Sequence, residues 1–114
     1  MTATKLITIK CLTRDGQTTT LSVPVVFTVD CLAVHKRPQY DDESAPPKRV
    51  WQITHIPTGY SVSGRVTLKT KAIAIQVCKD LAALDWSNVT PDGGTSHALS
   101  SCVRDVYVAH GLLT

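Results

Sequence analysis

Apolar and polar residues alternate along the first half of the chain, and this period of two is typical of β-strands with one buried face. Turn-forming residues separate the alternating stretches: an Asp15-Gly16 pair, Pro24, and the run Pro57-Thr58-Gly59. We therefore predict strands over five ranges: 4–12, 18–23, 25–35, 50–55 and 60–66.

The period changes in the second half of the chain. Between Thr67, a typical helix N-cap, and about Leu84, apolar residues recur every three or four positions, as on one face of an α-helix. A second helix, capped by Thr95 or Ser96, ends at Gly111. Strands followed by helices predict the α+β class, with a four- to five-stranded, mostly antiparallel sheet and both helices packed on one of its faces.

The length of 114 residues fits one domain, residues 1–114, whose core needs no metal or disulfide staple. The sequence contains no run of eighteen apolar residues and its first ten residues alternate, so we expect no transmembrane helix, no signal peptide and a cytoplasmic location. The cysteines fall on apolar positions without a Cys-x-x-Cys pair, which favours buried thiols. We expect no metal and no other cofactor.

Reactive side chains do not form a catalytic set along the sequence. Cys31 and His35 share a strand face but lie about 13 Å apart along an extended chain, too far for a Cys–His pair. The acids at 41–43 stand together in a loop and do not form an acid–base dyad. We therefore expect a protein that is not an enzyme. Under the enzymatic alternative, His55 and Cys31 would be the first residues to mutate.

Charge is distributed unevenly within a formal net charge of +3. Eight of the twelve basic residues lie between Lys36 and Lys79, and the proline-rich segment 37–49 predicts a long loop between the third and fourth strands. If those strands pair, four basic residues meet at the base of the loop, and we call them the basic collar: Lys36, Arg37, Lys48 and Arg49. The loop itself carries an acidic tip: Asp41, Asp42 and Glu43. The collar and the tip either bind a charged surface of a partner, or the acidic tip folds back and pairs with the basic collar of its own chain.

The outer face of the third predicted strand is a second candidate surface. Following Thr28 and Asp30, Leu32 and Val34 should point away from the helices. Exposed apolar residues on a sheet face mark an interface, here with a partner protein or with a second copy in a homodimer. A strand bulge that turns both residues inward is the alternative.

The basic stretch 36–79 also supports an alternative function, nucleic-acid binding. The residues that would carry it, beyond the collar, are Arg65, Lys69, Lys71 and Lys79. The chain has few aromatic residues, however, and lacks the sequence signatures of the common nucleic-acid-binding folds.

Residues 50–86 resemble the layout of small phage- and plasmid-borne accessory proteins, a broad class that includes anti-CRISPR and other anti-defence proteins. The likeness is carried by Val50-Trp-Gln-Ile-Thr-His-Ile-Pro-Thr-Gly59, then a short strand and a lysine-rich helix closing in Leu84-Asp-Trp86. It implies a compact inhibitor that occludes a host protein or ribonucleoprotein complex in the host cytoplasm, and it assigns no individual residue. The mild positive charge departs from the acidic DNA mimics of this class. We therefore expect a non-enzymatic protein-binding module that acts through the collar, the tip, Leu32 and Val34.

Overall fold

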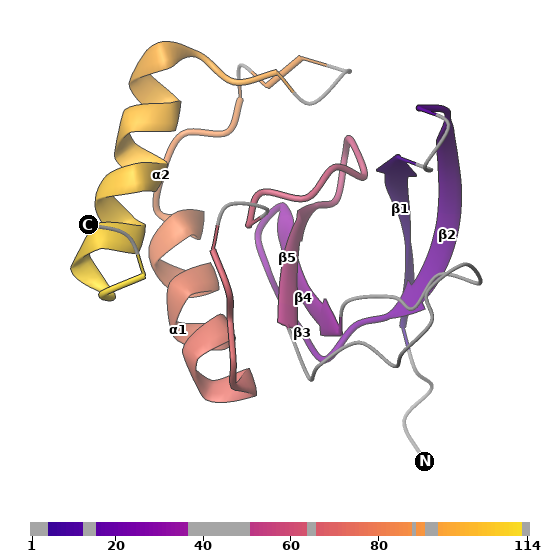
Figure 1. Ribbon diagram of the computed structural model, residues 1–114, viewed down its shortest axis with the longest axis horizontal. Coiled ribbons are helices and arrows are strands. Elements are labelled where there is room, and N and C mark those ends of the chain that lie inside the picture. The colour runs from indigo at the N-terminus through magenta and orange to yellow at the C-terminus, as the bar shows by residue number, and fades with distance from the viewer. Residues whose placement is uncertain are drawn as a thin grey trace.

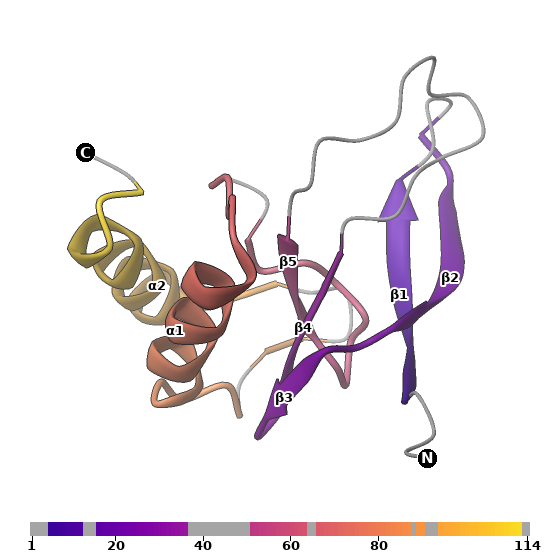
Figure 2. The same ribbon diagram turned by 90° about the horizontal axis from the view of Figure 1, so that it is seen from below.

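The computed structural model describes residues 5–12, 16–36, 51–63, 66–87, 89–90 and 94–112. Within these ranges, five strands precede two helices: β1 (Leu6–Leu12), β2 (Thr18–Pro24), β3 (Phe27–Val29), β4 (Leu32–Lys36), β5 (Trp51–His55), α1 (Lys71–Ala82) and α2 (His97–Ala109). Figures 1 and 2 show three layers: a ribbon of β1 and β2, a sheet of β3, β4 and β5, and the helix pair. The predicted α+β class is confirmed, and the five antiparallel strands divide between two sheets.

The first layer is the antiparallel β1–β2 hairpin, whose register places Ile9 opposite Leu21. The alternation read from the sequence holds here, because Ile7 and Ile9 are buried while Thr8 is exposed. Beyond Pro24 the chain crosses directly to the second sheet, where the N–H of Val26 donates to the carbonyl of Val34 at 3.0 Å.

The predicted third strand is in fact a hairpin. β3 and β4 pair with Val29 opposite Leu32, and the turn between them places Asp30 at a φ of +53°, a left-handed conformation that Asp tolerates better than most residues. This turn changes which face each following residue occupies. Leu32 and Val34 are fully buried against the helices, so the expected exposed outer face is wrong. Both side chains point inward, as the bulge alternative predicts. The cause, however, is a two-residue turn and not a bulge.

β4 is the central strand of its sheet and is covered on both faces. Leu32 and Val34 join the larger core under the helices, together with Ile53 of β5. Ala33 points the other way and joins a smaller core with Ile7, Ile9 and Val23 of the ribbon. The three layers are therefore held together by two apolar cores, one on each side of β4.

A main-chain contact closes the ribbon onto the end of β5. The turn after His55 places Gly59 at a φ of +76°, and the Gly59 carbonyl accepts a 2.7 Å hydrogen bond from the N–H of Lys10 in β1. A Cβ at Gly59 would lie 3.1 Å from the carbonyl oxygen of Thr8. Only glycine supplies both the left-handed backbone and this close approach.

The segment predicted as a fifth strand over 60–66 makes only isolated bridges in its described part. Ser61 bridges Thr54, and farther along Leu68 bridges Trp51. Leu68 is fully buried and bridges β5, and the helix begins later than predicted. The N-cap of α1 is Thr70, whose hydroxyl accepts a hydrogen bond from the N–H of Ile73 at 3.2 Å.

The second helix follows the prediction closely. Ser96 caps α2 by accepting from the N–H of Leu99 at 3.1 Å, and Gly111 follows the helix at a φ of +72°. α1 packs against the three-stranded sheet, and α2 packs against α1. Neither helix, within the ranges that the structure describes, has the length and apolar character needed to cross a bilayer.

Candidate functional site

Three of the predicted partner-binding residues fall within the described chain: Leu32, Val34 and Lys36. The first two belong to the core and are therefore not available to a partner in the folded chain. The rest of the collar and the tip lie outside the described residues: Arg37, Asp41, Asp42, Glu43, Lys48 and Arg49.

The pairing on which the collar depends is present. β4 and β5 are antiparallel neighbours, and their last pair is Lys36 opposite Trp51. The chain therefore leaves the sheet at the end of β4 and returns to it at the adjacent start of β5. The ammonium of Lys36, an exposed residue, lies 5.7 Å from the centroid of the half-buried Trp51 ring, which is within the range of a cation–π interaction.

Two lysines of the nucleic-acid alternative, Lys71 and Lys79, lie well apart on α1. Lys69, Lys71 and Lys79 are all exposed, but Lys71 and Lys79 lie about 12 Å apart along α1, given a rise of about 1.5 Å per residue. The ammonium of Lys79 lies 5.7 Å from the ring centroid of Phe27. Arg65 is outside the described residues.

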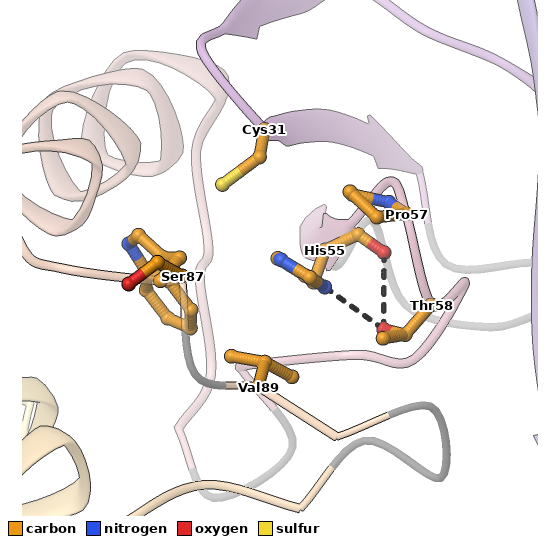
Figure 3. A pocket seen from close by; sticks show the side chains of 7 residues that line it. Cys31, His55, Pro57, Thr58, Ser87 and Val89 are labelled. Carbon is orange, nitrogen blue, oxygen red and sulfur yellow. Dashed lines mark hydrogen bonds between the residues drawn. The ribbon is translucent and has the colours of Figure 1, made fainter.

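The structure shows a pocket that the sequence did not predict. It has a volume of about 500 Å³ and opens between the turn before β4, the turn after β5 and the segment after α1 (Figure 3). Its lining residues are Cys31, His55, Pro57, Thr58, Trp86, Ser87 and Val89. His55 and Cys31 are the candidate residues of the enzymatic alternative, and no sequence spacing predicts that they are neighbours. Their proximity follows from the strand register, which pairs Leu32 with His55 and thus places Cys31 beside the end of β5.

His55 is held in one orientation within this pocket. Only 5% of the residue is exposed, and its ring stacks on Trp86 with centroids 5.7 Å apart and planes inclined by 27°. Its Nδ1 lies 3.0 Å from the hydroxyl of Thr58. Trp86 is itself fixed, because its indole N–H donates to the carbonyl of Leu81 at 2.7 Å.

The hydrogen bonds around Thr58 assign the tautomer of His55. The Thr58 hydroxyl donates to the carbonyl of His55 at 3.4 Å and accepts from the N–H of Tyr60 at 3.3 Å. All three contacts of the hydroxyl are satisfied together when Nδ1 of His55 carries the hydrogen and donates to Thr58, and we assign this tautomer. Burial lowers the pKa of His55, which favours the neutral ring, so Nε2 is an acceptor.

Nε2 of His55 has no hydrogen-bond partner among the described residues. Figure 3 shows it on the side of the ring away from Thr58, in the space that the Cys31 thiol also faces. The contrast with the other buried histidine of the sheet is clear. In His35, Nδ1 bonds to the carbonyl of Lys36 at 2.8 Å and Nε2 to the hydroxyl of Thr54 at 2.7 Å.

The thiol of Cys31 is poorly prepared for nucleophilic attack. The main-chain carbonyl of Cys31 accepts a hydrogen bond from the N–H of Ile56 at 2.8 Å, which fixes the turn against β5. Burial is the main cause that raises the pKa of Cys31, and the negative charge of Asp30 raises it further. The thiol is therefore protonated at neutral pH, and only the thiolate is an effective nucleophile. The arrangement suits binding better than thiolate chemistry.

Within the described ranges, no three His, Cys, Asp or Glu side chains come together as metal ligands would. Comparisons with protein families, with curated proteins and with solved structures find no match to this chain.

Proposed function

We propose that this chain is a non-enzymatic protein-binding module whose contact surface is the end of the β4–β5 hairpin. The observation that carries the proposal is the pairing of Lys36 with Trp51, which presents an exposed cation over an aromatic ring. Aromatic residues at the centre of an interface supply much of its binding energy, and a surrounding rim of charge provides specificity.

The sequence between these two residues supplies that charge. It contains the rest of the basic collar and the acidic tip, so the densest charge contrast in the sequence connects the end of β4 to the start of β5. A partner with a complementary patch would be steered by the local contrast, since the net charge of +3 is small.

The class of partner comes from the resemblance of residues 50–86 to small anti-defence proteins. We propose a host protein or ribonucleoprotein complex as the partner and inhibition by occlusion as the role. Nucleic-acid binding through Lys69, Lys71 and Lys79 is the alternative, favoured by the exposure of all three side chains.

Two matched quadruple charge reversals test the proposal. The collar variant changes Lys36, Arg37, Lys48 and Arg49 to Glu, and the control variant changes Lys5, Lys69, Lys71 and Lys79 to Glu. Both shift the net charge by the same amount, and both sets lie at exposed or loop-predicted positions. Thermal melts establish that each variant folds.

The readout is affinity capture from host lysate with mass spectrometry, with and without nuclease. We expect the collar variant to lose a nuclease-resistant protein partner that the control variant retains. Equal capture of the partner by the collar variant and by the unmodified chain would reject the end of the β4–β5 hairpin as the contact surface. Capture that nuclease abolishes and only the control variant loses would establish the nucleic-acid alternative.

A further inference from the structure

The pocket beside His55 contains a hydrogen-bond acceptor that the fold does not use. The residue is only 5% exposed, yet Nε2 of its ring has no partner among the described residues. Buried polar atoms in proteins are nearly always satisfied by the chain, by water or by a ligand. No side-chain nitrogen or oxygen in the described chain is both fully buried and unpartnered, so Nε2 reaches the open space of the pocket.

The walls of the pocket favour a flat apolar molecule. Trp86, Pro57 and Val89 contribute apolar surface, and the rings of His55 and Trp86 stack on each other as one rigid wall. The volume of about 500 Å³ lies within the usual range for small-molecule sites, about 300–1,000 Å³. Because both rings are anchored by hydrogen bonds, the site is largely preformed and binding requires little ordering.

The charges near the pocket disfavour an anion. The lining residues that the structure describes include no lysine or arginine, and the neutral His55 cannot act as a counter-ion. Two exposed carboxylates stand next to lining residues in the chain: Asp30 precedes Cys31, and Asp85 precedes Trp86. A carboxylate or phosphate ligand would meet like charge there.

We propose that this pocket binds a small, uncharged aromatic molecule with one O–H or N–H donor, such as a phenol or an indole. The donor bonds to Nε2 of His55, and the ring lies against the apolar wall formed with Trp86. The pocket is separate from the end of the β4–β5 hairpin, so ligand binding there does not depend on the proposed protein-binding function.

Phenol and toluene are suitable probes because they have nearly the same shape and differ in the hydroxyl donor. Each is titrated into the isotope-labelled, unmodified chain, and NMR shifts are followed for the His55 ring nitrogens and the Trp86 indole N–H. We expect phenol to bind about fivefold more tightly than toluene, the ratio that one hydrogen bond gives. Benzoate should bind more weakly than phenol.

Two variants test whether the preference for phenol over toluene arises in this pocket. His55→Phe keeps an aromatic ring beside Trp86 but removes the acceptor, and it should reduce the phenol preference to nearly one while toluene still binds. Val89→Trp fills the pocket and should weaken both ligands. Equal binding of phenol and toluene to the unmodified chain would overturn the proposal. Shifts centred away from Trp86 and His55 would also overturn it, as would the absence of any shift at the solubility limit.

Discussion

The hydroxyl of Tyr107 donates a hydrogen bond to the main-chain carbonyl of Val62, 45 residues earlier in the chain. Tyr107 is 3% exposed, and burial raises its pKa well above the ordinary tyrosine value. α2 otherwise packs mainly on α1, so this bond ties the outer helix directly to the segment after β5. Val62 is in turn fixed to β5, because its N–H donates to the carbonyl of Ile53 at 2.9 Å.

Removing this hydroxyl should weaken the attachment of α2. Tyr107→Phe keeps the ring but leaves the Val62 carbonyl without its donor, so we expect the free energy of unfolding to fall by about 1–2 kcal/mol. Urea denaturation followed by circular dichroism measures the change. An unaltered midpoint would show that water replaces the hydroxyl at no cost.

A second link to α2 should matter less. Nε2 of His110 lies 2.6 Å from a carboxylate oxygen of Asp80 in α1, and the two side chains are 25% and 57% exposed. Exposed ion pairs contribute little, so Asp80→Asn should cost less than about 1 kcal/mol in the same denaturation experiment. A larger loss than that of Tyr107→Phe would reverse the ranking of the two links.

The close approach of the ribbon to Gly59 predicts a difference between two glycines with similar backbones. Gly16 has a φ of +83°, and a Cβ there would have no heavy atom within 4 Å, whereas a Cβ at Gly59 would meet the main chain of Thr8 and Lys10. Gly16→Ala should cost about 1–2 kcal/mol from left-handed strain alone. Gly59→Ala should cost clearly more, and equal melting temperatures for the two variants would contradict the predicted contact.

Acidification should destabilise the fold before the carboxyl groups titrate. Burial lowers the pKa values of His35 and His55 below the ordinary 6.5, so the unfolded chain binds protons that the folded chain does not. This contribution to stability is present above the ordinary pKa of about 6.5 and is lost as the pH falls through the lowered pKa values of the folded chain. Chemical denaturation at several pH values measures the slope, which His35→Gln should reduce. Stability that rises on acidification would contradict this prediction.

Truncating Leu32 tests whether this fully buried side chain serves the core or an interface. Leu32→Ala should cost about 2–5 kcal/mol, as do comparable truncations of fully buried side chains. Val26, which is 43% exposed, provides the control, and Val26→Ala should change stability by less than about 1 kcal/mol. A stable Leu32→Ala variant with altered oligomeric state would restore the interface interpretation.

Local patterns predicted the elements that depend on local interactions. The β1–β2 hairpin, a cap of α2 at Thr95 or Ser96 (Ser96 in the structure) and the end of α2 at Gly111 all follow from short sequence signals. The predicted start of α1 lies three residues early, because Thr67 and Thr70 are equally good caps and tertiary packing decides between them. Leu68 is buried in the core and bridges Trp51 of β5, so the helix begins only after it.

Contacts between distant segments could not be predicted. The turn at Asp30 interrupts a stretch whose apolar and polar residues alternate as in a single strand. Because the two turn residues include no glycine, the sequence pattern does not indicate the turn. The pocket needs the β4–β5 register and the placement of Trp86 beside His55, and neither is encoded in local spacing. The sequence therefore identified His55 and Cys31 as reactive residues but not as neighbours.

The position of β4 between two cores has a consequence for cooperativity. Neighbouring residues of this strand contribute to opposite cores, Leu32 and Val34 to one and Ala33 to the other. Opening either core exposes one face of a strand that the other core also needs, and we therefore expect the ribbon and the helices to melt in one transition. The main-chain amides of β4 should then exchange with solvent more slowly than the rest, through global unfolding alone.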